Sequence, residues 1–167
     1  TPWTGLLTRA ATPLHATHRS TRCARSEQAL EERRVNEQEN IEAVKLLYAA
    51  FRRGDKATLV KGFADNVDWQ IAGPESIPIC GCRHGHEEVA QFFTVLAETL
   101  DTEQFEPRQF IAQDDTVVVL GHERHRAKST GRSYEGEWVQ VFTLRDAKVV
   151  KYREYFDTAA ALAAFRV

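Results

Sequence analysis

The stretch that decides the fold is YEGEWVQVFTL at residues 134–144, followed by KVVKYREYF at residues 148–156. Apolar and polar side chains alternate in both segments, which is typical of strands with one buried face. The dipeptide Asp146-Ala147 between them predicts a two-residue hairpin turn. The same period of two continues upstream and predicts two further strands, over residues 104–113 and 116–127.

Helical spacing dominates the chain before this meander. Apolar residues recur every three or four positions over 36–53, in a short segment after Asp55, and over 85–100. Asn36 followed by Glu39 resembles a capping box, so the first helix is expected to begin at Asn36. A strand over 67–71 and a final Ala-rich helix after Asp157 or Thr158 complete the pattern. Helices followed by an antiparallel meander predict an α+β fold with helices on one face of a bent sheet.

Composition excludes several classes of function. The chain has 167 residues and a net charge of −2, which offers no field for a nucleic-acid backbone, so nucleic-acid binding is not expected. It has no apolar run of 18 residues, so no membrane-spanning helix is expected. Its three cysteines are an odd number without framework spacing, which favours a reducing, cytoplasmic location.

A break in composition near residue 35 divides the chain. Residues 1–26 contain no acidic side chain and four arginines, with many Thr and Ser. Three interpretations stay open for residues 1–35: an organelle transit peptide, a disordered tail, or a non-native extension preceding an alternative start at Val35. The domain itself is expected over residues 36–167.

Several segments resemble the SnoaL-like branch of the ketosteroid-isomerase and nuclear-transport-factor-2-like superfamily. The similar segments are YAAF at 48–51, FADNVDW at 63–69, WVQVFTLRDAKV at 138–149 and REYFD at 153–157. The resemblance implies a cone-shaped, curved antiparallel or mixed sheet with three N-terminal helices enclosing a pocket for a small organic ligand. It also implies a homodimer and no cofactor. It leaves the activity open, because this superfamily includes isomerases, cyclases and non-enzymatic binding proteins.

The catalytic residues of steroid isomerases correspond poorly to the residues at the matching positions of this sequence. The resemblance places their base near Ile71, Ala72 and Gly73, none of which accepts a proton. Their tyrosine falls near Tyr48, and their second acid falls near Gln140, which donates a hydrogen bond but transfers no proton. Steroid isomerisation by that mechanism is therefore not expected, and Gln140 also weakens the cyclase interpretation.

Hairpin geometry predicts a different polar set. If Thr130-Gly131 is a two-residue turn, Glu123 lies opposite Trp138 and Gly121 opposite Gln140, and His125 shares their face. If Asp146-Ala147 is another such turn, Arg153 lies opposite Gln140 and Tyr155 opposite Trp138. A single bulge would exchange the faces, so either Arg153 or Glu154 points into the pocket.

Roles follow from residue chemistry. The candidate acids or bases are Glu123 and Glu154, because a carboxyl in an apolar pocket has a raised pKa. The other candidates are hydrogen-bond donors at Gln140 and Tyr48, pocket walls at Trp69 and Trp138, and ligand contacts at His125 and Arg153. The competing interpretation makes Glu123 and Arg153 a cross-strand ion pair on a surface, the aromatic residues core, and His125 solvated.

Four potential metal ligands alternate in CGCRHGH at residues 80–86: Cys80, Cys82, His84 and His86. In one extended strand, however, next-nearest side chains lie about 7 Å apart, too far for one tetrahedral zinc ion. No metal site is therefore expected. Two functions stay open for the pocket: an isomerase, cyclase or lyase acting by cofactor-free acid–base catalysis on a small apolar carbonyl or polyketide-like compound, or a non-catalytic ligand-binding or dimerisation module.

Overall fold

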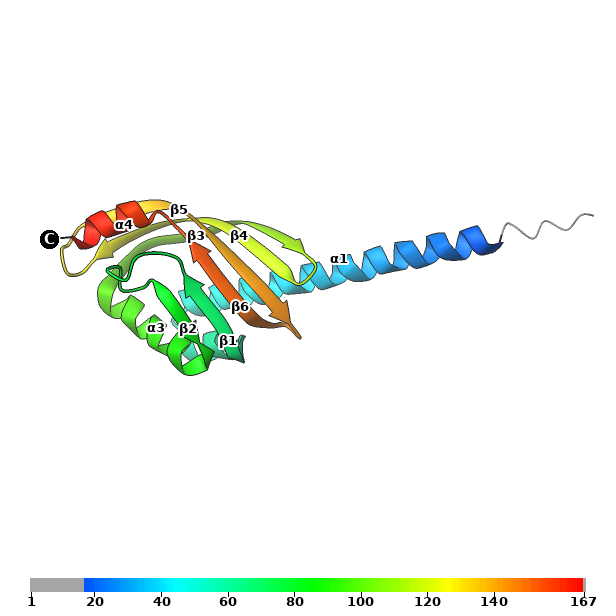
Figure 1. Ribbon diagram of the computed structural model, residues 1–167, viewed down its shortest axis with the longest axis horizontal. Coiled ribbons are helices and arrows are strands. Elements are labelled where there is room, and N and C mark those ends of the chain that lie inside the picture. The colour runs from blue at the N-terminus through cyan, green and yellow to red at the C-terminus, as the bar shows by residue number, and fades with distance from the viewer. Residues whose placement is uncertain (1–16, 167) are drawn as a thin grey trace, which may run out of the picture. The chain divides into compact units, whose positions relative to one another are not determined.

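The computed structural model describes the backbone of residues 17–166 and the side chains of residues 25–166. Helices come first, a meander of strands follows, and a short helix ends the chain, as the sequence predicts (Figure 1). The elements are α1 (Thr17–Arg52), α2 (Lys56–Lys61), β1 (Phe63–Ile71), β2 (Gly81–His84), α3 (Gly85–Thr99), β3 (Leu100–Gln113), β4 (Thr116–Ala127), β5 (Ser133–Arg145), β6 (Lys148–Tyr155) and α4 (Thr158–Phe165). Within the described part of the chain, no helix is long and apolar enough to cross a membrane.

The strands form one curved, open sheet in the order β2-β1-β6-β5-β4-β3 (Figure 1). Neighbouring strands are antiparallel, except that β1 and β6 are parallel. The residues of α1 from position 35 onward, together with α2 and α3, pack against the inner face, where Tyr48 of α1 contacts Phe142 of β5 and Phe93 of α3 contacts Trp69 of β1. The predicted α+β class with a cone-shaped mixed sheet is thus confirmed.

One strand was not predicted. β2 pairs with β1 at the sheet edge, with Gly81 opposite Ile71 and His84 opposite Asp68. The alternation over residues 80–86 is one of potential metal ligands rather than of apolar and polar side chains, so it did not predict a strand with one buried face. The edge is set by pairing with β1, which is a tertiary interaction.

The first helix begins earlier than the sequence predicts. α1 starts at Thr17, so Asn36 lies inside a helix and the predicted cap at Asn36 is wrong. Residues 26–34 (SEQALEERR) contain no Gly or Pro, and good helix formers there allow the helix to continue. The chain divides between Arg34 and Val35 into two units, which we describe separately. The idea that residues 1–35 are extraneous stays a prediction, and residues 1–16 lie outside the described residues.

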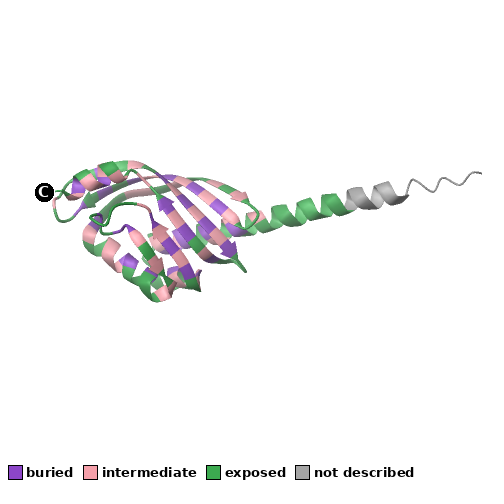
Figure 2. Ribbon diagram, viewed as in Figure 1, coloured by how far each residue is buried: buried purple, intermediate pink, exposed green. Residues whose placement is uncertain are grey.

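The core lies between the sheet and the helices. Buried residues alternate with partly or fully exposed ones along most of β4 and β5, as the colours of Figure 2 show. Trp138 is 1% exposed and stacks on Phe105 of β3, with ring centroids 4.8 Å apart and planes within 10°. Tyr48 contacts both rings. Aromatic packing therefore joins α1 to the centre of the sheet.

The connection between β4 and β5 corrects the predicted register. It spans residues 128–132 rather than two residues, and it places Gly121 opposite Trp138 and Val119 opposite Gln140. The predicted pairs of Glu123 with Trp138 and of Gly121 with Gln140 are therefore wrong by two residues. A shift of two preserves the face, because side chains alternate with a period of two.

The β5–β6 hairpin contains the bulge that the sequence left open. Asp146 and Ala147 form the predicted turn, with φ of 51° and 58°. Pairing then shifts by one residue between Leu144 and Thr143, and Val150 has no partner in the register. Beyond this bulge Glu154 lies opposite Gln140, and the predicted pairing of Arg153 with Gln140 is wrong. The bulge turns Glu154, rather than Arg153, toward the inner face.

We predict that Gly121→Ala destabilises the protein by overpacking. A Cβ at Gly121 would lie 2.1 Å from Cζ2 of the buried Trp138 indole, which is fixed by Phe105. The expected loss is about 1–3 kcal/mol in the free energy of unfolding, measured in urea. Gly136→Ala is the matched control on β5, because its Cβ would lie 3.3 Å from Asp157 Cβ. Equal losses for the two variants would contradict the prediction.

Candidate functional site

A cavity opens between the inner face of the sheet and the helices. The empty space in the cavity and in the open region at its mouth together comes to about 630 Å³. Nine of its eighteen lining residues are Phe, Tyr or Trp, and most of the others are aliphatic. Its polar side chains, apart from the two tyrosines, are Glu123, His125, Gln140 and Glu154. Such a cavity suits a flat, largely apolar ligand with few polar groups.

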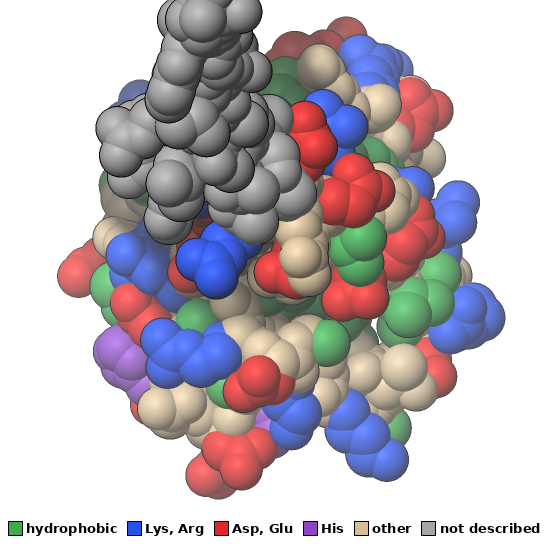
Figure 3. Space-filling model, turned by 90° about the vertical axis from the view of Figure 1, so that its right-hand side faces the viewer, with side chains coloured by type: hydrophobic (Ala, Val, Ile, Leu, Met, Phe, Trp, Pro, Cys, Tyr) green, Lys and Arg blue, Asp and Glu red, His purple; other side chains and the backbone are tan. Residues whose placement is uncertain are grey.

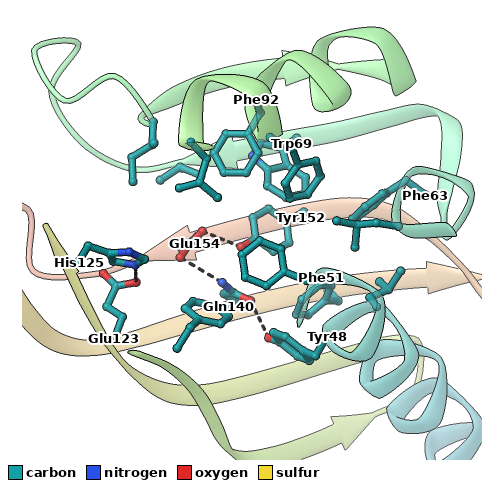
Figure 4. A pocket seen from close by; sticks show the side chains of 18 residues that line it. Tyr48, Phe51, Phe63, Trp69, Phe92, Glu123, His125, Gln140, Tyr152 and Glu154 are labelled. Atoms are coloured by element: carbon teal, nitrogen blue, oxygen red, sulfur yellow. Dashed lines mark hydrogen bonds and ion pairs between the residues drawn. The ribbon is translucent and has the colours of Figure 1, made fainter. Parts of the chain in front are cut away.

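A chain of hydrogen bonds crosses the cavity wall (Figure 4). The Tyr48 hydroxyl donates to Gln140 Oε1 at 2.6 Å, and Gln140 Nε2 donates to Glu154 Oε1 at 3.0 Å. The Tyr152 hydroxyl donates to the other oxygen, Glu154 Oε2, at 2.6 Å. α1, β5 and β6 thereby hold the carboxylate in a fixed orientation.

Burial, and after it the nearby Glu123 carboxylate, raise the pKa of Glu154, which reaches about 7 instead of its ordinary value of 4.5. The hydrogen bonds from Tyr152 and Gln140, together with His125, oppose this shift by stabilising the charged form. A carboxyl group with a pKa of about 7 both accepts and returns protons near neutral pH.

The two tyrosines of this network stay protonated. Burial and the neighbouring Glu154 charge raise the pKa of Tyr48 well above its usual value. The same two causes, in the same order, raise the pKa of Tyr152. Both side chains therefore act as hydrogen-bond donors rather than as acids.

A second polar pair lies on β4. Glu123 and His125 are 5% and 4% exposed, and His125 Nε2 lies 3.2 Å from Glu123 Oε2. Both line the cavity, so the interpretation of Glu123 as the partner of Arg153 on a surface is wrong. His125 is likewise buried rather than solvated.

Arg153 lies on the opposite face of the sheet. Its guanidinium donates to the backbone oxygen of Asp68 at 2.9 Å and forms an ion pair with the Asp68 carboxylate. The hydrogen bond from Arg153 is the main reason that the pKa of Asp68 is lowered. Arg153 does not line the cavity, so the predicted ligand contact there is not supported.

The two tryptophans have different places. Trp69 lines the cavity and stacks on Tyr152, with centroids 3.8 Å apart. Trp138 is buried core behind Phe105 and does not line the cavity. The structure therefore brings together six of the eight predicted side chains: Tyr48, Trp69, Glu123, His125, Gln140 and Glu154.

Tyr152, which also lines the cavity, was not among the predicted site residues. The spacing of two between Tyr152 and Glu154 within one strand was the available signal. The bulge at Val150 moved both side chains inward together.

The Cys and His residues before α3 form no metal site. Among the described residues, no group of three or more His, Cys, Asp or Glu side chains could hold a metal ion. Cys80 is buried, and burial raises the pKa of its thiol to about 11. His86 Nε2 contacts the backbone oxygen of Phe63 at 2.7 Å, which fixes the ring at the start of α3.

Charges on the surface are mixed. Over the face shown in Figure 3, basic and acidic side chains are interspersed. An example on the outer face of the sheet is Glu103, which pairs with Arg124 at 2.8 Å and also with Arg126. The basic charge of this described part of the sheet is thereby largely neutralised by its neighbours.

Fold and site together define a small α+β protein with an acidic, aromatic-lined ligand cavity. The chain belongs to the SnoaL-like domain family of the nuclear-transport-factor-2-like superfamily, whose domain matches residues 44–152. No protein among curated sequences is similar enough to match it.

Solved structures agree with this assignment. An NTF2-like protein from Burkholderia xenovorans LB400 is 38% identical, with a TM-score of 0.72 over 78% of this chain and 98% of that one. TerC, co-crystallised with polyporic acid, is 30% identical, with a TM-score of 0.67 over 76% and 98%. Bal32a, from a soil-derived mobile gene cassette, is 29% identical, with a TM-score of 0.64 over 78% and 99%. Three further neighbours, two named as putative isomerases and one as a putative SnoaL-like polyketide cyclase, are 18–20% identical and show the fold alone.

We predict that Glu154 makes stability depend on pH. Because its folded pKa of about 7 exceeds the ordinary 4.5, its contribution is complete below about pH 4.5 and is lost as pH rises through about 7. The loss is roughly 3 kcal/mol for such a shift. Urea unfolding at about pH 5 and about pH 8 should show a larger fall for the wild type than for Glu154→Gln. Identical falls in the two proteins would contradict the raised pKa.

Proposed function

We propose that this protein is an enzyme that moves protons on a small, largely apolar carbonyl compound without a cofactor, as an isomerase, cyclase or lyase. The observation that carries this proposal is the Glu154 carboxyl, buried in an aromatic cavity with a pKa near 7. A base with such a pKa is suited to removing a proton from carbon next to a carbonyl group.

The neighbouring groups support this role. Tyr152 and Gln140 hold the two carboxylate oxygens, so the base has a fixed direction. The Tyr48 hydroxyl donates a hydrogen bond to the Gln140 carbonyl oxygen and thereby fixes the orientation of the amide. The remaining N–H of Gln140 is a donor for a ligand oxygen. Trp69 and the phenylalanines exclude water, which strengthens these interactions.

The relative TerC was co-crystallised with polyporic acid, which supports a small organic ligand for this cavity as well. One observation favours a non-catalytic alternative. Both oxygens of Glu154 already accept hydrogen bonds from the protein, as in a group that only shapes a binding site. The two functions differ in whether protons are exchanged on a bound ligand.

We predict that the protein accelerates exchange of the benzylic α-hydrogens of β-tetralone for deuterium in D₂O, followed by proton NMR. Glu154→Gln should lower this rate about 100-fold or more, because the amide cannot accept the proton. The matched control is Glu75→Gln, at an exposed glutamate outside the cavity. Exchange at the same rate in wild type and Glu154→Gln would overturn the enzymatic proposal and leave the binding function.

We also propose a homodimer through the outer face of the sheet. Two neighbouring rows of partly exposed apolar residues cross this face, one over β3, β4 and β5 and the other over β4, β5 and β6. The rows contain Ile111, Val118 and Val141, and beside them Leu120, Val139 and Tyr155. Ile111 and Tyr155 are 46% and 52% exposed, so this apolar surface is suited to a second copy of the chain.

Sedimentation equilibrium should therefore give twice the chain mass of 19.0 kDa. Leu120→Lys should give a single chain mass, because a charge in the apolar rows has no partner across a two-fold interface. Leu46→Lys, at an exposed leucine of α1 outside the rows, should leave the dimer intact. A monomeric wild type would contradict the proposal.

Cysteine chemistry supports a cytoplasmic location, which we propose on that ground. Cys80 and Cys82 are both free thiols. They are separated by one residue, a spacing in which a disulfide would be strained. A reducing compartment is compatible with such thiols.

A further inference from the structure

The Glu123–His125 pair is a buried acid–base pair that the steps above do not use. Both side chains are at least nine-tenths buried and both line the cavity. Their approach at 3.2 Å joins Glu123 Oε2 to His125 Nε2. A carboxylate in this position accepts the Nε2 proton and stabilises an imidazolium ring.

The other ring nitrogen of His125, Nδ1, is evidence for a ligand. His125 Nδ1 is buried and has no hydrogen-bond partner among the described residues. A buried polar atom without a partner costs free energy and calls for an explanation. Because His125 lines the cavity, a polar atom of a bound ligand can supply that partner.

The surroundings define which protons this pair can move. Glu154 of β6 lies close enough to interact electrostatically with both members, and Figure 4 shows the pair at the Glu154 end of the cavity, away from Tyr48. Tyr134 of β5 contacts the ring of His125, with centroids 5.6 Å apart, and Phe105 of β3 lies beyond it at 6.4 Å. Among the described residues no Lys or Arg lines the cavity, so His125 is the one of these lining side chains that can carry a positive charge.

We infer that His125 is a second catalytic residue, a general acid whose Nδ1 proton goes to the ligand carbonyl oxygen while Glu154 removes a proton from the adjacent carbon. The C–H bond breaks, its proton forms an O–H bond on Glu154, and its electron pair becomes the C=C bond of an enol. The carbonyl π electrons take the His125 proton, which leaves neutral imidazole. Glu123 acts as a positioning residue through His125.

The reverse transfers complete a turnover. His125 takes back the enol proton, and Glu154 returns its proton to the ligand, at the same carbon or at the far end of a conjugated enol. The net change is a proton shift with no oxidant or reductant. The substrate class is therefore an enolisable ketone without an anionic group, because a carboxylate would face Glu123 and Glu154, and the His125 imidazolium is already paired with Glu123.

The inference rests on the proposed function, and rescue by imidazole tests it. His125→Ala should lower the β-tetralone exchange rate about 100-fold. Added imidazole should restore part of the rate by entering the space left by the ring, whereas pyrrole, which has no basic nitrogen, should not. Glu123→Gln should slow exchange with little change in the affinity for β-tetralone. The wild-type rate should fall at high pH, and His125→Ala should lose that limb of the profile.

Circular dichroism and β-tetralone binding confirm that each variant is folded, and His125→Asn serves as a second variant if His125→Ala is not. If both His125 variants exchange deuterium at the wild-type rate, the role of His125 is overturned and Glu154 stays as the base. Loss of exchange that imidazole does not restore, with the pH profile unchanged in shape, would assign His125 a structural role. Absence of exchange in the wild type would instead refute the proposed function.

Discussion

The unpaired residue Val150 is the constraint on which the site depends. It inserts one residue into β6, and every side chain after it changes face relative to β5. Glu154 consequently lies in the cavity opposite Gln140, and Arg153 lies outside beside Asp68. Without the insertion, a guanidinium would occupy the cavity wall and the carboxylate would be outside. One residue thus determines the sign of the charge at this position of the cavity wall.

Side chains from several elements stabilise the buried Glu154 carboxylate. Tyr152 and Gln140 each donate to one of its oxygens, and Tyr48 completes the chain from α1. These bonds stabilise the charged form, whereas burial and Glu123 destabilise it. The opposing effects leave the pKa near neutrality, a balance that a well-solvated or fully ion-paired carboxylate does not reach. The aromatic packing therefore helps to set the pKa of Glu154, because it excludes the water that would restore an ordinary pKa.

Much of the site could be predicted because side-chain direction is a local property of a strand. The prediction that Glu123, His125 and Gln140 share a face is correct although the predicted register was wrong by two residues, since such a shift keeps the face. The hairpin at Asp146 was also predictable, because a two-residue turn between alternating segments has few geometries. Trp138 was placed on the right face, yet Phe105 separates it from the cavity, and only side-chain packing determines that separation.

The sequence alone determined the element types, their order and the α+β class, because periodicity and turn residues act over a few neighbouring positions. It also determined the family, through segments that lie chiefly in α1, β1, β5 and β6. Tertiary structure decided which of Arg153 and Glu154 faces the ligand, where the β4–β5 strands pair, and that β2 forms an edge. These features depend on hydrogen bonds between distant segments, whose register no local pattern specifies.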